Sequence, residues 1–264
     1  MPIFVCEQCG ARYPASEPPH GCLICEDERQ YVRWGGQSWL SPEALGKSHR
    51  VVVRDDHGVL GLVIEPAFAI GQRALLVETQ QGNVLWDMIG LATPEAVEAV
   101  KARGRVIAIA ISHPHFYTAM ADWSAALGGV PVYIHADDHD WVTEPFPSLV
   151  PWSGETRALT DKLTLIRCGG HFPGATVLHQ RDGAGDTLFS GDVLQVAADR
   201  RHVSFMWSYP NLVPVNAAAV TRIAAALLPY GFERIYGGVE GRVIAGGGNA
   251  AFARSVHRYL RAIA

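Results

Sequence analysis

Long apolar runs, a strong net charge and a signal-like N-terminus are all missing from this sequence. No run approaches the roughly 20 apolar residues that a membrane-spanning helix needs. The formal net charge of −4 provides no basic surface for nucleic acid or an anionic membrane. Residues 1–5 lack the basic start and long apolar core of a signal peptide. We therefore expect a cytoplasmic protein that acts on a small molecule, with neither nucleic acid nor membrane as partner; a homo-oligomer stays open.

The cysteines of this sequence are not expected to form disulfides. With 264 residues, 48% of them hydrophobic, the chain can form one large domain, or one large and one very small domain. Its five cysteines need another explanation in a reducing compartment. Four of them form two C-x2-C pairs, Cys6 with Cys9 and Cys22 with Cys25. Two such pairs can build a tetrahedral cage of four thiolates, and Gly10 suits the first turn.

This cysteine pattern resembles the rubredoxin-like knuckle module of rubrerythrins and zinc ribbons. We assign residues 1–34 to it and prefer this to two disulfides of a secreted protein. Four thiolates suit zinc or iron equally, and the metal would stabilise a module too small for its own core. Residues 35–48 are predicted to be a connector, with Tyr31, Trp34 and Trp39 docking this part of the chain on the main domain.

Residues 49–264 alternate batches of strands and helices. Strands are predicted at 51–53, 59–64, 74–77, 84–86, 106–111, 132–134, 163–166, 176–179, 187–189 and 232–236, and helices at 93–101, 117–127, 215–228 and 249–264. Residues 144–154 are predicted to be a loop. This order indicates an α+β fold, an αββα sandwich of two sheets with helices outside.

Two histidines follow the apolar run at 106–110. On an extended backbone, side chains two residues apart point to the same side, so His113 and His115 would form a stiff pair around Pro114. Two ligands do not hold a metal against water. Further candidates stand where other strands end: His171 after two glycines, and Asp192 after Gly191.

Taken in order, these motifs resemble the metallo-β-lactamase-fold superfamily of metallohydrolases. The matching stretches are 113–115 (HPH), 170–174 (GHFPG) and 190–192 (SGD), and Asp87 matches the strand-end aspartate that orients the metal-binding loop. The resemblance covers about residues 48–264. It implies the αββα sandwich and a metal held by His113, His115, His171 and Asp192.

The departures from the family pattern concern the second metal. Tyr117 stands where the family motif HxHxDH has aspartate, and Thr118 stands where it has the second histidine. No histidine occurs near 236–238, where the last family histidine falls. The resemblance therefore implies one metal, with zinc as the first choice and iron or manganese as alternatives. Asp192 and Tyr117 are the catalytic candidates: Tyr117 either stabilises an oxyanion or fills the second site, and we favour the second role.

Three functions remain open. A zinc-bound water with a pKa near ~7 would suit hydrolysis of a small ester, thioester or lactone. Because the superfamily also contains iron proteins that work with rubredoxin modules, an iron-dependent redox protein is the alternative, and a non-catalytic member is the third. Among other candidates, His135 and His139 could share a helical face but are better explained as loop residues, and Cys168 as a core residue.

Overall fold

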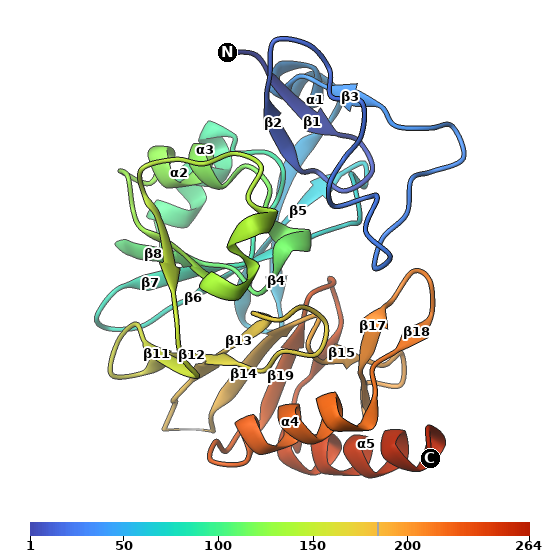
Figure 1. The fold of residues 1–264 in the computed structure, drawn as a ribbon. Coiled ribbons are helices and arrows are strands. Elements are labelled where there is room, and N and C mark those ends of the chain that lie inside the picture. The colour runs from blue at the N-terminus through green and yellow to red at the C-terminus, as the bar shows by residue number, and fades with distance from the viewer. Residues whose placement is uncertain (184) are drawn as a thin grey trace.

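Two large sheets lie face to face in the computed structural model, which describes residues 1–183 and 185–264 (Figure 1). The first sheet has the order β10-β9-β8-β7-β6-β5-β4. Its strands are β4 (Arg50–Asp56), β5 (Val59–Glu65), β6 (Ala74–Val77), β7 (Asn83–Trp86), β8 (Val106–Ala110), β9 (Val132–His135) and β10 (Leu149–Trp152). Strands β4 to β7 pair antiparallel, and β7 to β10 pair parallel.

The second sheet has the order β11-β12-β13-β14-β19-β20. Its strands are β11 (Thr156–Ala158), β12 (Leu163–Arg167), β13 (Thr176–Gln180), β14 (Thr187–Gly191), β19 (Arg234–Gly237) and β20 (Val243–Ile244). Two small hairpins follow β14, made by β15 (Gln195–Val196) with β16 (Val203–Ser204) and by β17 (Met206–Ser208) with β18 (Val213–Pro214).

Helices cover the outer faces of both sheets. Helices α2 (Pro94–Lys101) and α3 (Met120–Ala126) pack on the first sheet, and α4 (Ala217–Leu227) and α5 (Gly248–Ala262) on the second (Figure 1). The predicted αββα sandwich is thus confirmed. Among the described residues, no helix is both long and apolar enough to cross a bilayer.

Strand alternation explains the layered core. In β6, Leu75 and Val77 enter the cluster between the sheets, whereas Ala74 and Leu76 face the helices. Because successive side chains of a strand point to opposite faces, one strand serves both layers. The second sheet does the same through Phe189, which packs between the sheets, while neighbouring Leu188 packs toward α4 and α5.

The N-terminal residues form a small sheet of their own. Strand β1 (Ile3–Cys6) pairs with β2 (Arg12–Pro14) and with β3 (Trp39–Leu40), and helix α1 (Pro42–Ser48) follows. The Ser41 side chain caps α1 by accepting a hydrogen bond from Ala44 N at 3.1 Å. Strand β3 lies in the segment predicted as connector, so that segment completes the small sheet.

Three local predictions were wrong. The helix expected at 117–127 begins only at Met120, because residues 114–116 form a 3-10 turn. Residues 149–152, within the predicted loop, form β10 by parallel pairing with β9, a non-local contact that local composition does not reveal. Trp34 and Tyr31 were predicted to dock on the main domain, but both are exposed, with relative exposures of 106% and 45%.

The buried arginine Arg73 connects the two sheets. Its guanidinium pairs with Asp56 at the end of β4 and donates from Nε to the Gly237 carbonyl of β19 at 3.1 Å. Burial lowers the pKa of Arg73 to about 10, so the group stays charged at neutral pH.

We expect Arg73→Met to lower the free energy of unfolding by about 3–5 kcal/mol, because the buried Asp56 carboxylate loses its partner. Urea unfolding followed by circular dichroism measures the change. The matched control is Arg50→Met, which removes an exposed ion pair with Glu65 and should cost no more than about 1 kcal/mol. Equal losses in the two variants would contradict the role assigned to Arg73.

Candidate metal centres

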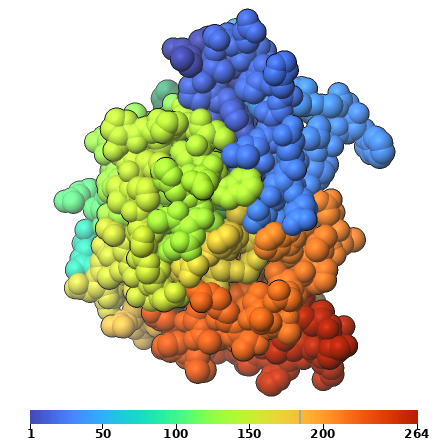
Figure 2. All heavy atoms as spheres, viewed as in Figure 1, coloured from blue at the N-terminus to red at the C-terminus, as the bar shows by residue number. Residues whose placement is uncertain are grey.

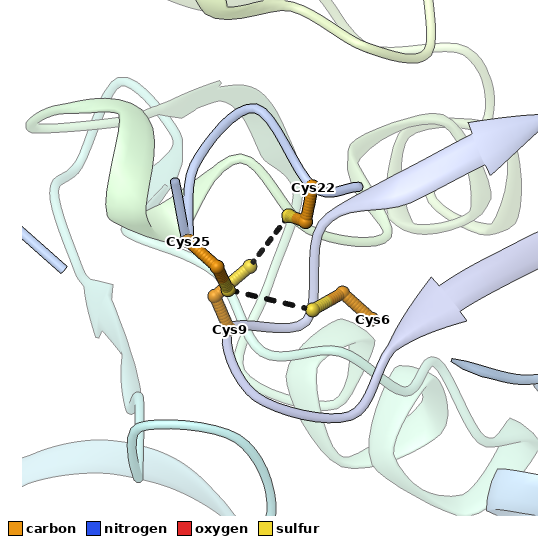
Figure 3. Close-up of side chains that lie close together, drawn as sticks. All are labelled: Cys6, Cys9, Cys22 and Cys25. Carbon is orange, nitrogen blue, oxygen red and sulfur yellow. Dashed lines mark hydrogen bonds between the residues drawn. The ribbon is translucent and has the colours of Figure 1, made fainter. Parts of the chain in front are cut away.

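The four predicted cysteines lie together at one point of the N-terminal module (Figure 3). The Sγ atoms of Cys6 and Cys25 are 3.6 Å apart, and those of Cys9 and Cys22 are 3.5 Å apart. A tetrahedral ion with metal–sulfur bonds of about 2.3 Å needs sulfurs about 3.8 Å apart, so the cage fits with little adjustment. All four thiols are free and buried, and the disulfide alternative finds no support.

Two side chains donate hydrogen bonds to the sulfurs. Gln37 Nε2 lies 3.1 Å from Cys6 Sγ, and the Tyr13 hydroxyl lies 3.5 Å from Cys22 Sγ. Donors of this kind stabilise thiolate charge, which a four-cysteine metal site concentrates in a small volume.

The second cluster gathers His113, His115, His171 and Asp192 from both sheets. His113 follows β8, His171 lies between β12 and β13, and Asp192 follows β14. One ligand atom from each residue lies within 4.8 Å of the others. His115 Nδ1 is 3.2 Å from His171 Nε2, and His113 Nε2 is 3.5 Å from Asp192 Oδ2. Nitrogens at about 2.0–2.1 Å from a tetrahedral zinc lie about 3.3 Å apart, so the spacing suits one ion.

Hydrogen bonds orient two of these rings. His113 Nδ1 bonds the Ser112 hydroxyl at 2.8 Å, and His171 Nδ1 donates to the Met206 carbonyl at 3.1 Å. The Nε2 atoms of both rings therefore face the cluster. His113 Nε2 is buried and lacks a hydrogen-bond partner among the described residues. A buried ring nitrogen without a hydrogen-bond partner that faces three other ligand atoms fits a role as metal ligand.

The prediction of an extended backbone through both histidines was wrong, although both side chains do reach the same cluster. His113 is extended (φ −170°, ψ 171°), but residues 114–116 form a 3-10 turn. Proline suits the first position of such a turn, so Pro114 ends the extended segment instead of stiffening it. The two rings, 5.0 Å apart and inclined at 74°, therefore offer different nitrogens, Nε2 of His113 and Nδ1 of His115.

Asp87 orients this loop, as the resemblance implied. Its Oδ1 accepts a hydrogen bond from Ser112 N at 2.8 Å, directly before His113. Burial raises the pKa of Asp87 to about 7. Gly191 allows the second sheet to approach: a Cβ there would lie 2.4 Å from Ser112 Oγ. The approach brings Asp192 to the histidines.

Burial lowers the pKa of two of the histidines and so favours the form that binds metal. It lowers the pKa of His171 to about 3 and that of His115 well below its usual range, so both rings are neutral imidazoles at pH 7. Burial alone would raise the pKa of Asp192, but the proximity of His113, whose Nε2 lies 3.5 Å from Asp192 Oδ2, outweighs this and lowers it. Neutral imidazoles and an ionised carboxylate are the forms that bind a metal.

The positions where the family pattern has ligands for a second metal hold Tyr117 and Thr118 in this chain, and Gly238 near the last of them. A Cβ added to Gly238 would lie 2.8 Å from Asp192 Oδ1 and 3.2 Å from Phe116 Cζ, so this position faces the site without offering a ligand. Thr118 Oγ1 instead donates to the Gly10 carbonyl at 2.6 Å. Tyr117 packs into the first core cluster, where burial raises its pKa well above its usual range, and both roles considered for it stay predictions.

The remaining candidates lie elsewhere. His135 Nε2 bonds the Gly154 carbonyl at 3.1 Å, and its ring packs on Trp152. His139 is exposed in the 3-10 turn at 136–141. Cys168 is a buried core residue, and burial raises its pKa to about 12. The sequence reasoning missed Arg29 and Gln72, which contact the His171 and His115 carbonyls; neither belongs to a motif that would single it out.

The fold defines the class of protein. No family model matches the chain. The structure is similar to that of VMB-1 (TM-score 0.60, 16% identity, 81% of this chain and 99% of that one). It is also similar to the metallo-β-lactamase FIM-1 of Pseudomonas aeruginosa in its mono-zinc form (TM-score 0.56, 17% identity, 80% and 96%). The chain has the metallo-β-lactamase fold, preceded by a four-cysteine module.

Comparison of sequences identifies a family within that fold. The uncharacterized protein YmaE of Bacillus subtilis is 40% identical over 269 residues, an alignment that spans 100% of this chain and 97% of YmaE. The chain belongs to the family of YmaE. Because the alignment includes the N-terminal residues, the four-cysteine region lies within the shared length.

We expect a thiol reagent to find no reactive cysteine in the native, metal-loaded protein and all five after unfolding with a chelator. Metal would protect four sulfurs, and Cys168 is fully buried with a raised pKa. Counting thiols with a chromogenic disulfide before and after denaturation measures both numbers. Rapid reaction of four thiols in the metal-loaded native protein would contradict metal ligation by the module.

Proposed function

We propose that the protein is a mononuclear metal-dependent hydrolase that cleaves a small ester, thioester or lactone. The observation that carries this is the convergence of His113, His115, His171 and Asp192, whose ligand atoms lie within 4.8 Å of one another. The mono-zinc form of FIM-1 supports the idea that this fold can hold a single zinc. Iron and manganese remain alternatives for the same ligands.

The residues around the site would prepare it for this chemistry. When bound, a zinc ion supplies Lewis acidity and a hydroxide at neutral pH. Ser112 and the Met206 carbonyl hold two imidazoles in orientation, and Asp87 holds the loop that carries them. The Asp192 side chain is 17% exposed, more than any of the three histidine side chains, so a substrate would arrive from its side.

The closed surroundings favour a small substrate. His113, His115 and His171 are between 0% and 3% exposed. A buried site strengthens electrostatic interactions with a polarised carbonyl but leaves little space for a bulky group. A small-molecule partner follows from this proposal; a cytoplasmic location and self-association stay predictions.

An iron-dependent redox protein is the second candidate, favoured by the contact between the two centres. Gln72 Nε2 donates to the Cys9 carbonyl at 2.8 Å and to the His115 carbonyl at 3.1 Å. One amide group therefore separates a cysteine of the first cluster from a histidine of the second. The same geometry supports the hydrolase equally if the four-cysteine metal is structural.

We expect two metal ions per chain, one in each cluster. Elemental analysis of protein purified without added metal measures their number and identity. His113→Ala should lose one ion and keep the other, because the clusters share no ligand. Zinc in both sites supports the hydrolase; iron with visible absorbance in the four-cysteine site supports the redox protein. Three ions per chain would contradict the mononuclear proposal.

We expect His115→Ala to lower hydrolysis of a panel of small esters, thioesters and lactones to about 1% or less, because the metal loses a ligand. Initial rates on the panel measure the effect. His139→Ala is the matched control, since this exposed histidine lies outside both clusters. The hydrolase proposal fails if the two variants keep equal rates, or if the metal-loaded protein cleaves no member of the panel.

A further inference from the structure

The N-terminal module lies against the loop that carries His171. Figure 2 shows the N-terminal residues (blue) against the green and orange parts of the chain. The residues that close the cluster on this side follow the second cysteine pair, at positions 27–30, which we call the strap. Its central residue, Arg29, is only 6% exposed although arginine is a surface residue by default.

Arg29 occupies an aromatic cage next to His171. Its guanidinium carbon lies 3.8 Å from the ring centre of Phe172, 4.5 Å from that of Trp207 and 5.1 Å from that of Trp141. Arg29 Nη1 donates to the His171 carbonyl at 3.3 Å. A cation desolvated among three aromatic rings is held much more firmly than one at the surface.

Asp27 completes the cage from within the strap. Its carboxylate accepts from Arg29 Nε at 2.5 Å and Nη2 at 2.9 Å. The charge of Arg29 is thus neutralised by a residue that moves with it. The pair can leave the cage together, and no unpaired charge then stays behind in the domain.

The β17–β18 hairpin holds the strap from outside. Trp207 Nε1 donates to Glu28 Oε1 at 3.1 Å, and Ser208 Oγ donates to the Arg29 carbonyl at 3.1 Å. Asn211 Nδ2 donates to the carbonyls of Glu28 at 3.0 Å and Gln30 at 2.8 Å. Because Met206 of this hairpin accepts the hydrogen bond of His171, strap and ligand share one support.

The first cysteine pair is attached on the other side. Gln72 joins the carbonyls of Cys9 and His115, and Thr118 donates to the carbonyl of Gly10. The first knuckle therefore contacts the segment that carries His115, and the strap after the second knuckle contacts the loop that carries His171. Any change that disorders the knuckles removes contacts from both sides of the cluster.

The order of the module depends on its sulfurs. Its core cluster consists of four cysteines with Ala11 and Ile24, against which Tyr13, Trp39 and Trp141 pack. A core this small needs metal to stay folded. The strap begins two residues after Cys25, so its position depends on that core.

We propose that the four-cysteine module is a metal-dependent cover of the His/Asp site, with Arg29 as its latch. Access to the histidine side of the site then requires release of Arg29, and loss of the four-cysteine metal opens the cover. The inference rests on the site described under the proposed function, but not on its being hydrolytic.

The test measures access to the three histidines directly. Diethyl pyrocarbonate modifies accessible neutral imidazoles, and mass spectrometry of peptides gives separate rates for His113, His115 and His171. The protein keeps its four-cysteine metal, while the His/Asp site is stripped with a chelator. We expect Arg29→Ala to raise these rates by about tenfold or more, because the latch loses its cation–π contacts.

Matched variants separate latching from general damage. Arg33→Ala removes an ion pair with Glu7 in the same module but away from the site, and its rates should equal those of the wild type. Asn211→Ala frees the strap from outside the module and should also raise the rates. Removing the four-cysteine metal from the wild type with a mercurial should raise them at least as much as Arg29→Ala.

Each outcome decides the proposal. Equal rates in wild type, Arg29→Ala and Asn211→Ala would overturn it, as would no change on removal of the four-cysteine metal. If Arg29→Ala also loses that metal, the test uses only the comparison of histidine labelling rates between Asn211→Ala and the wild type. Absence of esterase activity would refute the hydrolase and leave the labelling result unaffected, so the two failures are distinguishable.

Discussion

The meeting of the two sheets at Ser112 is the contact on which the metal cluster depends. Ser112 N donates to Asp87 of the first sheet, and its carbonyl accepts from Thr176 N of the second sheet at 2.9 Å. Its hydroxyl orients His113, and Gly191 leaves room for it. Since His113 and Asp192 come from different sheets, a wider spacing here would separate them and leave buried ligands without a common ion.

The burial of the His/Asp cluster affects both the charge of its histidines and the access to it. Burial keeps the imidazoles of His115 and His171 neutral, and a neutral imidazole binds metal without competition from a proton. Gly238 also faces the cluster, close to Asp192 and Phe116, without a side chain that could bind metal. If the cluster holds the single ion proposed above, access to that ion is a property that the rest of the chain can control.

The N-terminal module is placed to exert that control. In a separate electron-transfer or structural module, few contacts with the neighbouring domain would be needed. Here Arg12 pairs with Asp122 of α3 and with Glu144, and Arg29 enters the domain beside His171. These buried charges tie the position of the module to the main domain, so the two candidate centres act as parts of one structure.

Most ligand positions could be predicted because they combine local rules with order along the chain. Glycines and polar residues at strand ends singled out His171 and Asp192, and the C-x2-C pairs singled out the four cysteines. The backbone of the histidine pair could not be predicted, because Pro114 is compatible with an extended strand and with the first position of a turn. Arg29 could not be found either, since its aromatic partners lie far along the chain, at Trp141, Phe172 and Trp207.

The sequence by itself determined which residue types are available: two pairs of thiols, three imidazoles and one carboxylate, with no ligand where a second metal would need three more. These are facts of chemical identity, and folding does not change them. Only the tertiary structure decided that Gly238 lies beside Asp192 and Phe116, that Gln72 joins the two centres, and that the strap lies against His171 and Phe172. Such contacts depend on the distance between segments remote in sequence, which packing of the two sheets sets and no local pattern encodes.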